Sequence, residues 1–265
     1  MTSDLLLTIV AAAKRAAETR AGHAEARPLP EPLRTPRGDE FEASLRAGGV
    51  RIIGECKRRS PSRGLLRREY DPAAIAREYQ AAGAAAISVL TEPTFFSGSL
   101  DHLRAVRAAV DVPVLRKDFL VTDFQILESA ASGADAVLLI VGALNRDQLE
   151  CLIARTRAMK LAALVEVHDR RELDMALEAN ASIIGVNSRN LRTLEVDVAV
   201  FDELAPFIPP GVIAVAESGL RTPADLARLR SGRYNAFLIG ERLMTERSPG
   251  AALASLRLAA EEAAS

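Results

Sequence analysis

An acidic and a basic residue, Glu55 and Lys57, lie together at the end of a predicted strand that begins at Val50. Residues two apart on a strand share a face, so both side chains point the same way as Ile53, toward whatever the strand covers. Burying such a pair costs free energy because both charges lose their hydration, so a buried pair is more often kept where it has a function. A single pair is explained equally well as a structural ion pair. Repetition of the pattern along the chain would favour chemistry.

Similar polar residues follow the later predicted strands. They are Lys117, Glu166 and Glu217, with Asn187 and Arg189 from one further strand end. Lysines and carboxylates that are buried close together are expected to push each other's pKa toward neutrality, which suits general acid–base chemistry. If these strand ends meet in space, the sequence predicts a polar active site.

Two other features of the strand ends bear on the type of chemistry. Lys117 shares a strand face with Phe119, whose ring could hold a planar substrate, and a lysine in such a place can form a Schiff base. His168 lies at a strand end and Asp169 opens a helix, so we interpret them as packing and an N-cap, not as metal ligands. Neither an HExxH motif nor a cysteine cluster is present.

Small residues follow the last two predicted strands. Ser218 and Gly219 come after the seventh, and Gly240 comes after the eighth. Small side chains let backbone N–H groups approach an anion closely, and these two loops commonly bind phosphate in parallel barrels. The pair of loops therefore predicts a phosphate site.

Apolar runs of strand length, without alternation, occur at eight places and are separated by amphipathic helical stretches. The predicted strands cover residues 50–56, 85–90, 112–116, 134–141, 161–167, 182–187, 212–216 and 236–239. The predicted helices cover residues 72–82, 100–110, 123–132, 146–159, 170–179, 198–204, 223–229 and 249–262. Strands buried on both faces that alternate with helices are parallel, and eight such units indicate an α/β fold with a single (β/α)8 TIM barrel.

A doubly wound open sheet is the main alternative. It would be supported by a GxGxxG or GxxxxGK[ST] motif after a strand, and neither is present. The barrel is favoured, and it would gather the polar strand ends at one mouth.

Residues 1–49 are predicted to form an N-terminal helical extension packed on a barrel domain of residues 50–265. The first segment reads as an amphipathic helix with Leu5 and Ile9 on its apolar face. A proline-rich connection, residues 27–36, and a short helix, residues 39–47, lead to the first strand.

The net charge and the cysteine content indicate which partners and which cellular compartment to expect. The formal charge is -1, which argues against a role with nucleic acid or at a membrane surface, and no apolar run is long enough to span a membrane. The two cysteines, Cys56 and Cys151, fit a reducing cytoplasm better than a disulfide framework. By alternation Cys56 faces away from Glu55 and Lys57, which favours a packing role.

Taken together, the strand-end motifs resemble the indole-3-glycerol phosphate synthase family of tryptophan biosynthesis. The matching pieces are IIGECKRRSPSRG, VLRKDF, GADAVLLI, LVEVHD, IIGVNSRNL, AESG and FLIGERLM. The resemblance implies a cytoplasmic, monomeric or loosely associated barrel, with no metal or organic cofactor, that has scope to associate with other enzymes of the pathway. Its substrate would be 1-(2-carboxyphenylamino)-1-deoxyribulose 5-phosphate, and its products indole-3-glycerol phosphate, carbon dioxide and water.

The resemblance also implies a role for each strand-end residue. Lys117 would be the general acid on the ketose oxygen, Lys57 would sit near the anthranilate carboxylate, and Glu166 with Lys57 or Glu55 would serve the dehydration. Asn187 and Glu217 would orient the hydroxyls and the lysines. The remaining substrate contacts implied are Ser60, Phe119, Arg189, Leu191 and Leu238, and the implied phosphate contacts are Ser218, Gly219, Gly240 and the backbone of Glu241.

The sequence shows three departures from the family pattern and leaves three rival functions open. One departure is the segment of residues 120–124, which is less typical of the family. Cys56 replaces an expected aliphatic residue, and Arg242 stands where a small residue is common, where it would either add a phosphate contact or crowd the corner. The rivals are a Schiff-base aldolase, a phosphosugar isomerase, and a barrel that binds a phosphosugar without catalysis. The last would be expected to lack one of Lys57, Lys117 and Glu166, and all three are present.

Overall fold

The strands form a closed parallel barrel in a computed structural model that describes residues 4–26, 29, 31 and 34–263. Part of the predicted connection, residues 27–28, 30 and 32–33, lies outside the described residues. The barrel strands are β1 (Arg51–Cys56), β4 (Ala86–Leu90), β5 (Val114–Lys117), β6 (Ala136–Ile140), β7 (Ala162–Val167), β8 (Ile183–Asn187), β9 (Ile213–Glu217) and β10 (Ala236–Ile239). Their hydrogen-bonded order is β1-β10-β9-β8-β7-β6-β5-β4, and β4 pairs with β1 to close the ring.

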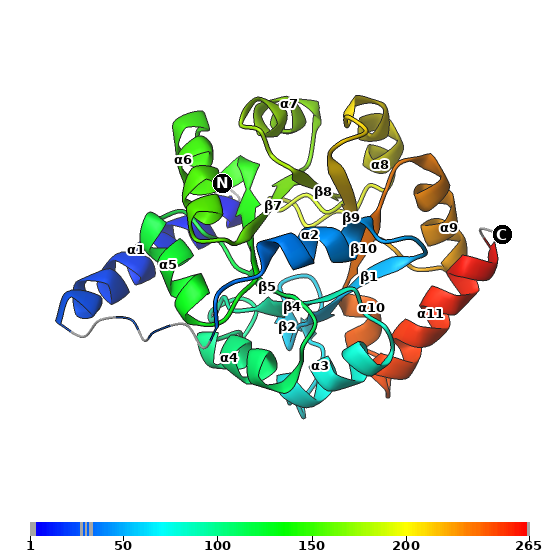
Figure 1. Cartoon of the computed structure of the whole chain (residues 1–265), viewed down its shortest axis with the longest axis horizontal. Helices are drawn as coiled ribbons and strands as arrows, with labels where there is room; N and C mark the ends of the chain where they lie inside the picture. The colour runs from blue at the N-terminus through cyan, green and yellow to red at the C-terminus, as the bar shows by residue number, and fades with distance from the viewer. Residues whose placement is uncertain (1–3, 27–28, 30, 32–33, 264–265) are drawn as a thin grey trace.

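Helices surround this ring, as Figure 1 shows. They are α3 (Pro72–Ala81), α4 (Leu100–Ala109), α5 (Asp123–Ala131), α6 (Arg146–Ala158), α7 (Arg170–Glu178), α8 (Ala199–Leu204), α9 (Pro223–Gly232) and α11 (Pro249–Ala263). The (β/α)8 barrel is therefore confirmed, and every predicted strand and helix appears within a few residues of its expected bounds. Five short elements were not predicted: β2 (Arg59–Ser60), β3 (Gly64–Leu65), α10 (Glu241–Met244) and the 3-10 turns η1 (Val141–Ala143) and η2 (Ala205–Phe207).

The apolar strands are buried on both faces because they separate two cores. Inward-facing residues such as Ile53 and Leu115 form a cluster inside the barrel, whereas Ile52 and Cys56 belong to the larger cluster between strands and helices. Cys56 thus faces outward as predicted, and its Sγ lies 3.8 Å from the carbonyl oxygen of Pro72. Burial raises the pKa of the Cys56 thiol well above its usual range, which fits a packing role.

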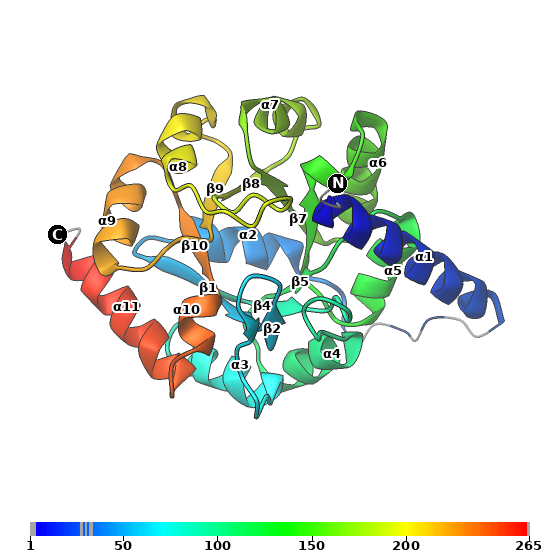
Figure 2. The same ribbon diagram turned by 180° about the vertical axis from the view of Figure 1, so that it is seen from behind.

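The N-terminal segment contacts both ends of the barrel. Helix α2 (Gly38–Arg46) lies across the end seen in Figure 1, touches β7 and β9, and buries Phe41 and Leu45 in the interior cluster. Helix α1 (Leu5–Ala26) lies on the opposite side, where Figure 2 shows it beside α5. No helix in the described residues is long and apolar enough to cross a membrane.

A buried carboxylate, Asp135, ties this segment to the barrel. Its oxygens accept hydrogen bonds from Arg34 Nη2 and Arg107 Nη1, both at 2.8 Å, and from the backbone N–H groups of Arg37 and Val114, both at 3.0 Å. Asp135 is fully buried, so these donors compensate its charge within the described part of the chain.

We expect Asp135→Asn to lower the free energy of unfolding by about 3 kcal/mol, because it removes one charge of a buried network and leaves two arginines facing an amide. Urea unfolding followed by circular dichroism measures the change. Asp147→Asn, at an exposed position of α6, is the control and should change stability by less than about 0.5 kcal/mol. Equal unfolding midpoints for the two variants would show that the network does not stabilise the fold.

Candidate active site

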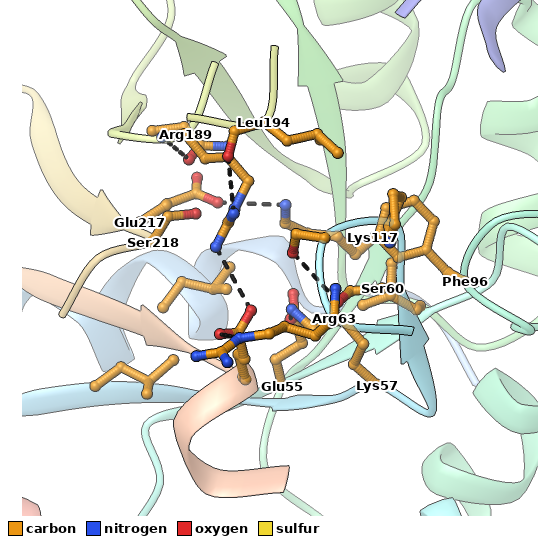
Figure 3. A pocket seen from close by; sticks show the side chains of 18 of the residues that line it. Glu55, Lys57, Ser60, Arg63, Phe96, Lys117, Arg189, Leu194, Glu217 and Ser218 are labelled. Atoms are coloured by element: carbon orange, nitrogen blue, oxygen red, sulfur yellow. Dashed lines mark hydrogen bonds and ion pairs between the residues drawn. The ribbon is translucent and has the colours of Figure 1, made fainter. Parts of the chain in front are cut away.

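A cavity of about 830 Å³ opens at the carboxyl ends of the barrel strands (Figure 3). The register explains why the side chains meet there, because each contributing residue ends or follows its strand. Every residue predicted for the site lines it: Glu55, Lys57, Ser60, Lys117, Phe119, Glu166, Asn187, Arg189, Leu191, Glu217, Ser218, Gly219, Leu238, Gly240 and Glu241.

Lys117, at the end of β5, lies between two carboxylates at the centre of the cavity. Its Nζ is 3.2 Å from Glu166 Oε2 on β7 and 3.3 Å from Glu217 Oε2 on β9. The lysine side chain is 14% exposed and each carboxylate side chain only 1%, so the carboxylates depend on protein groups for their charge balance. One cation is thus shared by two acids.

Although Glu166 and Glu217 share one cation, their pKa values shift in opposite directions. Burial alone would raise the pKa of Glu166, but Lys117, His168 and Asn187 outweigh it and hold that pKa well below its usual value. Burial and the neighbouring charge of Glu166 raise the pKa of Glu217 to about 8, despite Lys117. At neutral pH, Glu166 is ionised and Glu217 holds a proton, an arrangement that supplies both a base and an acid.

The expectation that Lys117 would shift toward neutrality was wrong. Burial does act to lower the pKa of Lys117, but the charges of Glu166 and Glu217 outweigh it and raise that pKa well above the usual value. The group that moves toward neutrality is Glu217. Sequence shows that the three side chains share a mouth, but not that two carboxylates lie within 3.3 Å of the one ammonium.

Glu55 and Lys57, at the end of β1, form an ion pair. Lys57 Nζ lies 2.6 Å from Glu55 Oε1, and Glu55 is only 3% exposed. Gly240 leaves room for it, because a Cβ there would lie 2.1 Å from Glu55 Oε1. Gly185 on β8 does the same for Glu217, whose Oε1 would lie 2.1 Å from its Cβ. Both glycines make space for a buried carboxylate, and Gly185 was not predicted.

The corner predicted to bind phosphate has an unusual backbone and two arginines. Ser218 and Gly219 have φ values of 65° and 68°, a left-handed conformation that is uncommon for serine. The Glu241 carboxylate lies 2.9 Å from Arg63 Nε and 3.5 Å from Arg189 Nη2. Glu241 was predicted to contribute its backbone only, and Arg63 was not predicted.

An apolar wall also lines the cavity. Phe119, Leu191 and Leu238, which were predicted to hold the aromatic ring, belong to it. Phe96, which follows β4, adds a ring whose centroid lies 6.3 Å from that of Phe119. Leu5 and Ile9 of α1 complete the lining, although they lie far away in sequence.

The prediction for Asp169 is confirmed, whereas that for His168 was incomplete. Asp169 is the N-cap of α7 as predicted, since its Oδ1 accepts the N–H of Glu172 at 2.8 Å. The interpretation of His168 as packing missed its partners, because the imidazole contacts Glu166 and Glu172. In the described part of the chain, no three His, Cys, Asp or Glu side chains converge as metal ligands.

The fold has counterparts among solved structures. Thiamine phosphate pyrophosphorylase from Pyrococcus furiosus aligns with a TM-score of 0.61 at 19% identity, over 81% of this chain and 96% of that one. Such a likeness shows the fold alone. The fold and the site together define a (β/α)8-barrel enzyme with a lysine–carboxylate centre at the strand ends.

Sequence comparison then identifies the family. The chain matches the family model of indole-3-glycerol phosphate synthase over residues 8–256. It is 55% identical to the indole-3-glycerol phosphate synthase of Mycobacterium sp. strain KMS, over 81% of this chain and 79% of that protein. It is 52% identical to indole-3-glycerol phosphate synthase 1 of Streptomyces coelicolor, over 84% and 82%. The chain belongs to the indole-3-glycerol phosphate synthase family.

This membership confirms the family and the function predicted from the strand-end motifs. The protein is an indole-3-glycerol phosphate synthase, a carboxy-lyase of tryptophan biosynthesis with a small phosphosugar substrate. An aldolase, an isomerase and a non-catalytic barrel are therefore set aside.

Proposed function

We propose that Lys117, Glu166 and Glu217 carry the proton transfers that convert 1-(2-carboxyphenylamino)-1-deoxyribulose 5-phosphate into indole-3-glycerol phosphate. The observation that carries this proposal is the position of Lys117 Nζ, 3.2 and 3.3 Å from two buried carboxylates whose surroundings shift their pKa values in opposite directions. In the reaction, the ring carbon that bears the carboxylate attacks the ketose carbonyl. Carbon dioxide then leaves, and the new hydroxyl departs as water.

Lys117 acts first in this sequence, as the acid that protonates the ketose oxygen during ring closure. Its ammonium is the only part of the cluster that is charged and partly open to the cavity, at 14% exposure. A proton lost to the substrate is replaced from Glu217, which holds one at neutral pH and lies 3.3 Å away. Glu217 therefore keeps the lysine charged through the catalytic cycle.

Lys57 and Glu166 act on the later steps. Lys57 binds the anthranilate carboxylate, and its pairing with Glu55 at 2.6 Å supports a fixed ammonium position. Glu166, which is ionised and buried, takes up the proton whose removal allows water to leave. Lys57 or Glu55 takes part in the proton transfer to the departing hydroxyl. Asn187 orients the sugar, since its Oδ1 already accepts the N–H of Arg189 at 3.0 Å.

The phosphate and the aromatic ring of the substrate bind to different residues of the cavity. The phosphate lies at the backbone of Ser218, Gly219, Gly240 and Glu241, where Arg63 and Arg189 supply positive charge. Ser60, from the first loop, lies beside the substrate, and Arg242 lines the same corner. The aromatic ring lies against Phe119, Leu191 and Leu238.

Because Glu217 is the proposed proton source, we expect kcat/KM to depend on pH. Its raised pKa means that the proton is present below about pH 8 and is lost as the pH rises through that value. We expect kcat/KM to fall on that alkaline limb. Glu217→Gln cannot titrate, so it should be slower and should lack the limb. Steady-state rates between pH 6 and 10 measure it, and an unchanged limb in Glu217→Gln would assign the titration to another group.

We also propose a domain organisation, a compartment and an association with other enzymes. Residues 1–49 form an extension of the barrel domain of residues 50–265, which the burial of Phe41 and Leu45 in the barrel interior supports. The protein works in the cytoplasm, where its buried Cys56 and exposed Cys151 stay reduced. Association with other enzymes of the tryptophan pathway stays a prediction, which analytical ultracentrifugation of the mixed proteins would test.

The proposed reaction is tested by mixing the purified protein with the substrate and following indole fluorescence, with and without a chelator. We expect signal in both cases. Substrate that binds but gives no indole fluorescence would show that this chain has lost the chemistry of its family.

A further inference from the structure

His168, a half-buried residue without a role in the proton transfers proposed above, follows β7 and precedes α7. It lies on the side of Glu166 away from Lys117. His168 Nε2 is 3.3 Å from Glu166 Oε1, whereas Lys117 binds Glu166 Oε2. Glu166 Oε1 and His168 Nε2 are both buried and face each other across this ion pair, and Asn187 is a further, neutral neighbour of the Glu166 carboxylate.

The imidazole is held in this orientation from behind by Glu172, in the first turn of α7. Glu172 Oε2 accepts hydrogen bonds from the His168 backbone N–H at 2.8 Å and lies 3.0 Å from His168 Nδ1. Asp169, which caps α7, fixes the backbone of Glu172 in turn. A histidine whose Nδ1 is held by a carboxylate presents its Nε2 in one direction. Here that direction is Glu166.

This contact makes the two acids of the cluster unequal. Glu166 has Lys117 on one oxygen and His168 on the other, with Asn187 as a neutral donor beside them, whereas Lys117 is the only cation within 4.0 Å of Glu217 among the described residues. A carboxylate with two cationic neighbours ionises before a carboxylate that shares one. We propose that His168 is a positioning residue that makes Glu166, and not Glu217, the ionised carboxylate of the cluster.

The charge of the imidazole follows from the groups that face it, Glu166 from β7 and Glu172 from α7. Burial disfavours the imidazolium, but the two carboxylates outweigh it and raise the pKa of His168 to about 10. Lys117 lies beyond Glu166 and does not contact the ring. His168 is therefore a permanent cation at neutral pH, and its loss would let the shared proton move from Glu217 toward Glu166.

The inference rests on the proposed role of Glu166, and kinetics of three variants test it. His168→Leu removes both contacts and should lower kcat by about tenfold to a hundredfold with little change in KM. His168→Gln can still donate a hydrogen bond to Glu166 but carries no charge, so it should recover only part of that loss. Glu172→Gln should give an intermediate kcat, because the ring keeps its place but loses the charge behind it. His23→Leu, at an exposed position of α1, is the matched control.

A nuclear magnetic resonance titration of the imidazole nitrogens gives a readout that a merely structural role would not move. The chain has 3 histidines, so the signal lost in His168→Gln identifies His168. It should stay doubly protonated above pH 8 in the wild type and titrate lower in Glu166→Gln. Wild-type kcat in His168→Leu, or a neutral His168 at pH 7, would overturn the inference.

The double variant separates this inference from the role of Glu166 itself. If Glu166→Gln is slow, then adding His168→Leu to it should cost little more, because the histidine acts through that carboxylate. Additive losses would overturn the positioning role. A fully active Glu166→Gln would instead remove the proposed role of Glu166, whatever His168 does. If His168→Leu does not fold, His168→Gln and Glu172→Gln still decide, since neither removes a polar group from its site.

Discussion

Lys117→Ala is expected to lower kcat by at least about a thousandfold while changing substrate affinity by less than about tenfold. The reason is that the ammonium acts mainly on the oxygen that gains charge as the ring closes, and binding uses the phosphate corner and the apolar wall as well. Single-turnover indole formation and equilibrium binding, measured on the same preparation, give the two numbers. Lys14→Ala, at an exposed position of α1, controls for loss of a lysine as such.

The substitution also leaves Glu166 and Glu217 without their shared cation. Glu217 already holds a proton at neutral pH, and Glu166, which loses one of its two cationic neighbours, should take one up more readily. The fold should therefore survive, which circular dichroism checks. A large loss of affinity with kcat unchanged would show that Lys117 binds substrate and takes no part in proton transfer.

Glu166→Gln is expected to lower kcat by about a hundredfold to ten-thousandfold without unfolding the barrel. Glutamine has the same shape and can still accept a hydrogen bond from Lys117, but it cannot accept a proton. Steady-state kinetics give the loss, and a thermal melt followed by circular dichroism tests the fold. Glu203→Gln, at an exposed position of α8, is the matched control.

The outcome of that melt decides between two roles. Glu166 is 1% exposed, so a purely structural carboxylate there would also be damaged by substitution. A barrel that unfolds in Glu166→Gln would return the residue to a structural role. A folded and slow enzyme supports the role of base.

The convergence of Lys117, Glu166 and Glu217 was predictable from sequence because it depends on topology. Parallel strands in a closed barrel all end at the same mouth, so a residue that ends an apolar run is placed there whatever the details of packing. The same logic put Cys56 on the outer face and Glu55 on the inner one. Helix starts such as Thr122, whose side chain accepts the Gln125 N–H, follow equally local rules.

Contacts between strands and across loops were not predictable in this way. Gly185 is needed because Glu217, on the neighbouring strand, occupies the space of its side chain, which depends on the register between β8 and β9. The approach of Arg63 to Glu241 depends on how the first loop folds over the barrel. The partners of His168 and the place of Leu5 in the cavity depend on distances that no local pattern encodes.

The central claim is that Lys117 protonates the ketose oxygen. A crystal structure of the protein with a reduced substrate analogue, whose carbonyl is replaced by a hydroxyl, tests it most directly. We predict that the hydroxyl oxygen lies about 2.7–3.2 Å from Lys117 Nζ, with the phosphate at the backbone of Ser218 and Gly219. A hydroxyl that contacts Lys57 alone, with Lys117 still bound only to Glu166 and Glu217, would contradict the claim.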